Sequence, residues 1–262
     1  MRGWWREISG LVLPAACGGC GVPRTPLCEE CAAELYGAPA RRVSPDPRPP
    51  GLPVVYAAAP YADAVRAVLL AHKERGDLGL ARPLGIALAG AVRTAAASLT
   101  LTAAADGPAR ARGGPLLLVP VPSARTAVRA RGHDAARRIA LAAAGELRRT
   151  GTDATVLPVL RQRRPVADQA GLTARERAAN LTGALRVAGG AGRLPTGGTV
   201  VAVDDLMTTG ASLAEAARAL REAGARDGVP GGAPVVAAVV AAPVISFPTE
   251  EEPVVWGKRC TQ

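Results

Sequence analysis

The chain contains few aromatic side chains. Only 3% of its 262 residues are aromatic, and none lies in the arginine-rich stretch 110–177. Proteins that bind single-stranded nucleic acid usually stack the bases on aromatic side chains set in a basic groove. The composition therefore disfavours nucleic acid as the main ligand, while single-stranded DNA stays open as a partner.

Long apolar runs are also missing. No continuous apolar segment approaches the roughly 20 residues that a membrane-spanning helix needs. The apolar core at residues 11–13 is too short for a signal peptide. We therefore expect a cytoplasmic protein with no membrane span.

Lysine is nearly absent from a strongly basic chain. The formal net charge is +10, and lysine occurs only at Lys73 and Lys258, so arginine carries almost all of the positive charge. The planar guanidinium group suits the paired oxygens of a phosphate. The charge balance therefore predicts a polyanionic ligand: a nucleotide, a nucleic acid or a diphosphate.

Four cysteines near the N-terminus form two C-x2-C pairs. They are Cys17, Cys20, Cys28 and Cys31. Two such pairs can close a tetrahedral zinc site, and four thiolates leave no open position for a substrate, so the zinc would be structural. Gly18 and Gly19 suit the positive backbone angles that a tight turn needs. Disulfides and unligated thiols remain alternatives, although a cytosolic compartment disfavours disulfides.

Apolar runs and helical periods alternate after residue 53. We expect strands over 54–59, 116–121, 156–160, 184–187, 200–203 and 235–242, and helices over 62–72, 83–98, 134–149 and 212–223. Buried strands that alternate with helices predict an α/β fold, with a mainly parallel sheet flanked by helices. The expected organisation is a four-cysteine element (1–40), a proline-rich linker (41–53), the α/β domain (54–245) and a tail (246–262).

One segment, V-V-A-V-D-D-L-M-T-T-G-A-S at residues 200–212, combines two chemistries. Asp204 and Asp205 end a predicted buried strand, where ligands bind in a parallel sheet. The following loop leads into a helix, whose first N–H groups favour a phosphate. The loop would hold that phosphate through the backbone and hydroxyl groups of Thr208, Thr209, Gly210, Ala211 and Ser212. A sugar phosphate satisfies both halves, with its hydroxyls over the carboxylates.

This segment resembles the phosphoribosyl diphosphate signature of type I phosphoribosyltransferases, and further blocks are similar to the ComF/GntX family. Those blocks are the four-cysteine stretch Cys17–Leu35, Tyr61–Asp77 (ending H-K-E-R-G-D), Leu116–Gly132 (L-L-L-V-P-V-P-S-A-R-T-A-V-R-A-R-G) and Gln169–Asn180 (Q-A-G-L-T-A-R-E-R-A-A-N). Together they cover most of residues 11–245. The chain departs from the family pattern at Glu74, at His133-Asp134-Ala135 and at Val166.

The resemblance implies a type I phosphoribosyltransferase fold and the transfer of ribose 5-phosphate from phosphoribosyl diphosphate, with Mg²⁺, to an unidentified acceptor. Asp204, Asp205 and Arg177 would act in catalysis. Arg125, Arg129 and Arg131 would hold the diphosphate, Lys73 would lie near the ligand, and residues 161–182 would form a mobile loop. A non-catalytic module that binds phosphoribosyl diphosphate or a nucleotide, and an accessory protein of DNA uptake, remain alternatives. A homodimer is also open.

Overall fold

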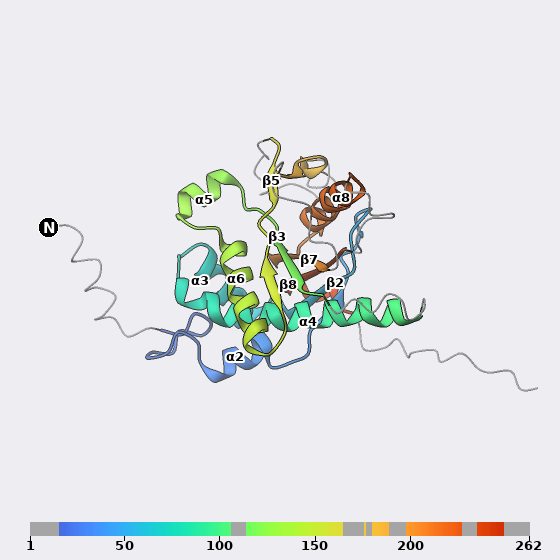
Figure 1. Ribbon diagram of the computed structural model, residues 1–262. Helices are drawn as coiled ribbons and strands as arrows, with labels where there is room; N and C mark the ends of the chain where they lie inside the picture. Colours follow the sequence, from blue (N-terminus) through green and yellow to red (C-terminus); the bar gives the residue numbers. More distant parts are fainter. Residues whose placement is uncertain are drawn as a thin grey trace, which may run out of the picture.

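The computed structural model describes residues 16–105, 114–164, 176, 180–188, 198–226 and 235–248. A six-stranded sheet forms its centre (Figure 1), with the strand order β1 (Arg41–Val43), β2 (Val55–Pro60), β8 (Val235–Ala242), β7 (Thr199–Leu206), β3 (Leu116–Pro120) and β4 (Ala154–Val156). All neighbouring pairs are parallel except β1 with β2. The predicted α/β fold with a mainly parallel sheet is therefore confirmed.

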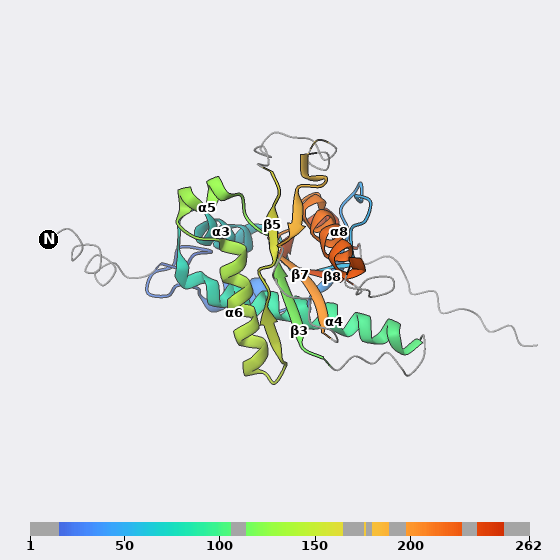
Figure 2. The same ribbon diagram turned by 45° about the horizontal axis from the view of Figure 1, so that its top comes forward.

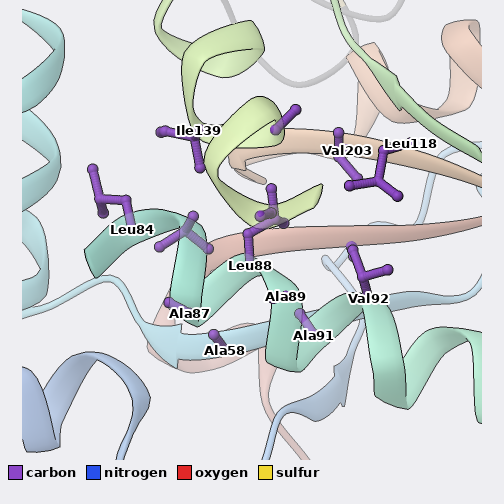
Figure 3. Packing of buried hydrophobic residues seen from close by; sticks show 14 of the residues in the cluster. Ala58, Leu84, Ala87, Leu88, Ala89, Ala91, Val92, Leu118, Ile139 and Val203 are labelled. Atoms are coloured by element: carbon purple, nitrogen blue, oxygen red, sulfur yellow. The ribbon is translucent and has the colours of Figure 1, made fainter. Parts of the chain in front are cut away.

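Helices cover both faces of the sheet. One face packs against α3 (Asp63–Lys73), α4 (Ala81–Ala105) and α6 (Ala135–Arg149), while α8 (Ala211–Arg226) covers the other. Because side chains alternate along a strand, neighbours enter different cores. Leu118 and Val203 meet α4 and α6 (Figure 3), whereas Leu117 and Ala202 pack with α8.

The four-cysteine element is not a separate body. Its helix α2 (Glu29–Tyr36) places Leu35 in the same core as α3 and α4, and Ala64 of α3 packs with Cys17 and Cys31. Residues 41–43, the first of the expected linker, form the antiparallel edge strand β1. No helix within the described ranges is both long enough and apolar enough to cross a membrane.

Three segments differ from the sequence prediction. The strand expected over 156–160 divides into β4 and β5 (Leu160–Gln162), because Pro158 has no N–H to donate to a sheet. β5 then pairs with β6 (Leu185–Val187) in a separate antiparallel hairpin, so the expected strand at 184–187 does not join the main sheet. A short helix, α5 (Arg125–Arg131), occupies the loop expected after β3 and ends at Gly132, where φ is 77°.

Helices α4 and α6 approach each other closely at Gly85. A Cβ atom added there would lie 2.5 Å from the Ala142 Cβ and 2.8 Å from its carbonyl carbon. A backbone neighbour cannot turn away as a flexible side chain can. The sequence therefore needs a residue without a side chain at this position.

We expect Gly85→Ala to lower the free energy of unfolding by about 1–3 kcal/mol, because α4 and α6 must move apart. Chemical denaturation would measure this. Gly90→Ala in the same helix is the control: an added Cβ there meets nothing within 4 Å, so helix propensity predicts a gain of up to about 1 kcal/mol. Equal effects of the two substitutions would contradict the close approach.

Candidate functional site

The two neighbouring aspartates lie in the last residues of β7. The strand is longer than predicted and runs through both to Leu206, with Asp204 opposite Val239 of β8. Asp205 is buried, and its Oδ2 forms an ion pair with Lys73 Nζ at a distance of 2.7 Å. The Asp205 backbone N–H donates to Asp204 Oδ1 at 2.9 Å. Lys73 ends α3, so two distant segments of the chain meet at this point.

A cavity of about 640 Å³ opens above the aspartates. Figure 2 shows α3 and α5 on one side of this end of the sheet, with β5 and α8 on the other. The cavity gathers Lys73, Arg131, Asp204, Asp205, Thr208 and Ser212 from the predicted site residues. Ser123, Thr126 and Gln162 also line it. Carboxylates, cations and hydroxyl groups therefore share one space.

The electrostatics of this cavity depend on the aspartate pair. Burial and the neighbouring Asp205 carboxylate raise the pKa of Asp204 well above its ordinary value. Burial alone would lower the pKa of Lys73, but the charges of Asp205 and Asp204 raise it overall. Lys73 therefore remains protonated and offsets one carboxylate, so the acid pair repels an incoming anion less than two free charges would.

We expect Asp204→Asn to stabilise the unliganded protein by about 1 kcal/mol near neutral pH. The raised pKa means that the native state binds a proton more tightly than the unfolded chain. Stability supplied by this carboxyl is therefore present at low pH and is lost as pH rises from the unfolded pKa to the native one. Asparagine removes that loss and keeps an Oδ1 acceptor for the Asp205 N–H.

Urea denaturation at several pH values would measure this difference. The free energy of unfolding of the variant should exceed that of the wild type by a growing amount as pH rises from the unfolded-state pKa of Asp204 to its native pKa. At acidic pH the two free energies should converge. A variant less stable than the wild type at neutral pH would show that Asp204 is not held under electrostatic strain.

The loop between β7 and α8 has the backbone shape that the sequence suggests. Gly210 has φ of 74°, and a Cβ atom there would lie 3.1 Å from Leu52 side-chain atoms. Ala211 begins α8 and is buried. Thr208 and Ser212 face the cavity, whereas Thr209, Gly210 and Ala211 do not line it with the others.

The predicted arginines do not all line the same cavity. Arg131 lines the cavity, and its buried Nη1 makes no hydrogen bond within the described residues, although Glu74 Oε1 lies 3.5 Å away. Arg129 instead lines a smaller cavity of about 300 Å³ beside Ser123. The Arg125 side chain and all of Arg177 fall outside what the structure describes.

Several contributors were missed by sequence reasoning. Lys73 and Asp205 were both predicted as site residues, but their ion pair joins segments that no local pattern connects. Ser123 could have been noticed, since it follows the V-P-V-P run at the end of β3. Gln162 and Leu185 reach the cavity only because the β5–β6 hairpin leaves the main sheet.

The four cysteines form a compact cluster. All four sulfurs lie within 4.8 Å of one another, with Cys17 Sγ 3.7 Å and Cys20 Sγ 3.6 Å from Cys28 Sγ. These distances exceed the S–S bond of about 2.05 Å, and the four thiols are free. The predicted grouping is therefore confirmed as a set of ligands suited to a metal ion.

The glycines of the cysteine cluster have a different role from the predicted one. Positive φ occurs at Gly21 (81°) and Arg24 (72°), not at Gly18 or Gly19. A Cβ at Gly19 would lie 2.6 Å from Cys31 Sγ, so close approach is what requires glycine there. Burial alone would raise the pKa of Cys17, but backbone N–H donors, those of Cys20 and Cys28 first, lower it to about 6. Burial and the neighbouring thiols raise the pKa of Cys31, so without a metal the cluster favours a thiolate at Cys17 and a thiol at Cys31. A metal ion would require the remaining thiols to lose their protons as well.

The aspartate cavity and the cysteine cluster are separate sites on one body. A scan of protein-family models and a search of curated proteins found no match to this chain. Functional interpretation therefore depends on the residues that meet in the cavity.

Proposed function

We propose that the aspartate cavity binds phosphoribosyl diphosphate and that the protein transfers ribose 5-phosphate to an acceptor. The observation that carries this proposal is the meeting of an acid pair, two cations and a hydroxyl-bearing loop in one cavity. A sugar that carries both a phosphate and a diphosphate requires each of these groups. The type I phosphoribosyltransferase fold and the likeness to ComF/GntX proteins belong to the same proposal.

The loop before α8 would hold the 5'-phosphate. The first N–H groups of a helix have no partner inside the helix, and its dipole favours an anion. Thr208 and Ser212 add hydroxyl donors from the cavity wall. Gly210 allows the chain to turn closely at this point.

The acid pair and the cations would hold the remainder of the ligand. Asp204 and Asp205 would accept hydrogen bonds from the ribose hydroxyls. The Arg131 guanidinium, which lines the cavity, would donate to a diphosphate oxygen. Mg²⁺ would enter with the diphosphate and neutralise part of its charge.

The transfer would break the bond between the anomeric carbon and the diphosphate oxygen, which leaves with the bonding electrons. A nucleophilic atom of the acceptor would form the new bond at that carbon and lose its proton to solvent or to a base. Positive charge would develop on the sugar in between, and the charge of Asp204 and Asp205 would stabilise it. Arg131 would stabilise the leaving group.

The cysteine cluster would hold a structural zinc ion. Tetrahedral zinc with bonds of about 2.3 Å places its sulfurs about 3.8 Å apart, and the sulfurs of Cys17 and Cys20 lie 3.7 and 3.6 Å from that of Cys28. Four thiolates would fill the coordination sphere. The zinc would therefore hold α2 against α3 and α4, away from the chemistry.

Calorimetric titration with phosphoribosyl diphosphate and Mg²⁺ tests the proposal. We expect the Asp204→Asn, Asp205→Asn variant to bind about 100-fold more weakly or worse, since ribose contacts and the Lys73 pair are lost together. The control is Asp63→Asn, Asp153→Asn, which removes two exposed carboxylates outside the cavity. It should bind as the wild type does.

The outcome also separates enzyme from binding module. Binding that is lost only in the first variant, together with diphosphate release in the presence of an acceptor, would support the transferase. Binding without turnover across nucleobases, amines and ammonia would favour the non-catalytic module. A folded wild type that does not bind would contradict both.

A further inference from the structure

A second cavity lies on the opposite side of α5 from the aspartate cavity. It measures about 820 Å³, and its walls come from the start of α4, the end of α5 and the first turns of α6. The two cavities have no lining residue in common. Thr126 and Ala130 of α5 face the aspartate cavity, whereas Val128 faces the second one, so α5 is the partition between them.

The second cavity is basic. Arg82, Arg137 and Arg138 line it, and none of them forms an ion pair with a carboxylate in the described part of the chain. Asp134 is its one acidic residue, and that carboxylate already accepts from the Arg137 N–H and the Ser123 hydroxyl. Three guanidinium groups beside one engaged carboxylate favour an anionic ligand.

The same cavity has an apolar part. Leu78 and Leu141 both line it and are 44% and 52% exposed. They approach from different elements, the turn before α4 and the second turn of α6. A ligand that places an apolar or planar group between them would cover both side chains while its charged end meets the arginines.

An imidazole with one unpartnered nitrogen also lines the cavity. His133 lines it, and its Nδ1 lies 3.2 Å from the Arg131 carbonyl oxygen, so Nδ1 carries the proton in the neutral ring. Its Nε2 is buried and makes no hydrogen bond within the described residues. The His133 ring lies beside the fully buried His72, with the ring centroids 5.6 Å apart. His72 Nε2 also makes no hydrogen bond within the described residues.

We propose that this second cavity binds a small phosphorylated molecule with a planar or apolar group, of the nucleoside monophosphate class. The phosphate meets Arg137 and Arg138, and the planar group lies between Leu78 and Leu141. The cavity volume is within the range of about 300–1,000 Å³ typical of small-molecule sites. This size and the recessed imidazole favour a small molecule over a protein segment. The inference does not depend on the ligand of the aspartate cavity.

Calorimetric titration of the full chain with adenosine 5'-monophosphate and with inorganic phosphate provides the test. In Arg137→Gln, Arg138→Gln, we expect adenosine monophosphate to bind about tenfold more weakly or worse. Glutamine keeps the helix propensity of arginine, and both side chains are exposed, so folding should not change. The control is Arg42→Gln, Arg66→Gln, which removes the same charge outside the aspartate cavity, the second cavity and the smaller one beside Ser123, and should leave binding intact.

A second comparison tests the apolar part. Leu141→Ala should weaken the binding of adenosine monophosphate by roughly three- to tenfold and leave the binding of inorganic phosphate unchanged.

Three results would overturn the proposal. One is unchanged adenosine monophosphate binding in Arg137→Gln, Arg138→Gln, which would place the ligand elsewhere. Another is an equal loss in the Arg42, Arg66 control, which would indicate general charge attraction. The third is no binding of either probe to the folded wild type; a glutamate- and leucine-rich peptide that binds instead would make the cavity a protein-docking site.

Discussion

Replacing Glu215 by alanine is expected to lower the free energy of unfolding by about 3 kcal/mol, because it removes one partner of a largely buried ion pair. Glu215 lies on α8 and is 5% exposed. Its carboxylate accepts from Arg218 Nε and Nη2, each at 2.8 Å, and from the Leu185 N–H at 2.9 Å. Arg218 Nη2 also donates to the Leu185 carbonyl at 2.9 Å.

This arrangement attaches the β5–β6 hairpin to α8. Burial alone would raise the pKa of Glu215, but the Arg218 guanidinium and the Leu185 and Gly183 N–H groups lower it overall. Alanine would leave the Leu185 N–H without its acceptor and would remove the buried partner of Arg218, which would keep only the Leu185 carbonyl and the exposed Glu222 carboxylate. An unsatisfied buried donor costs more than the bond itself contributes. Because Leu185 and Gln162 line the aspartate cavity, ligand binding should weaken as well.

Thermal and urea denaturation would measure the loss, and a fall in melting temperature of roughly 10 °C is expected for a chain of this size. The matched control is Glu222→Ala, which removes the other carboxylate paired with Arg218. Glu222 lies 2.8 Å from Arg218 Nη1 but its side chain is 50% exposed, so water replaces the contact and the cost should stay below about 1 kcal/mol. Similar losses in the two variants would contradict the assigned role of Glu215.

Replacing Cys31 by serine is expected to reduce bound metal from about one ion per chain to nearly none, because a structural zinc site needs its complete thiolate set. Cys31 is buried, and its sulfur lies among the other three. Loss of the metal would leave four polar groups clustered without a charge to neutralise them. The segment around α2 should then detach from α3 and α4.

Elemental analysis of the purified protein would count the metal, and hydrogen exchange would follow the amides of residues 16–36. We expect faster exchange there in Cys31→Ser, with the central sheet unchanged, since the cluster is at the periphery of the core. Cys260→Ser is the control and should retain the metal, because four ligands are already present without it. A wild type that is folded in this segment and free of metal would contradict the proposed zinc.

The central strands of the sheet could be predicted from sequence because most of their residues are buried. The runs at residues 116–120 and 235–242 are apolar throughout and bounded by turn residues, which is typical of parallel strands covered on both faces. The cysteine cluster could be predicted for a different reason: the spacing of the cysteines directly indicates that they can share one metal ion. Both expectations are confirmed at that level, as a parallel α/β sheet and a set of metal ligands.

The remaining differences arise from contacts between distant segments. The separate β5–β6 hairpin depends on Glu215 and Arg218 of α8, which no pattern near residues 160–187 reveals. Glycine at position 19 is required by a sulfur twelve residues away, not by its own backbone angle. The Lys73–Asp205 pair joins the end of α3 to β7. Sequence reasoning located the aspartates and their loop, but it could not identify the surfaces that close the cavity around them.

A crystal structure of the protein with phosphoribosyl diphosphate and Mg²⁺ would decide whether the aspartate cavity is the site of ribose 5-phosphate transfer. We expect the 5'-phosphate against the loop of Thr208–Ser212, the ribose hydroxyls on Asp204 and Asp205, and the diphosphate toward Arg131. A ligand bound elsewhere, or a cavity that stays empty at millimolar ligand while the protein is folded and metal-loaded, would contradict the proposed function.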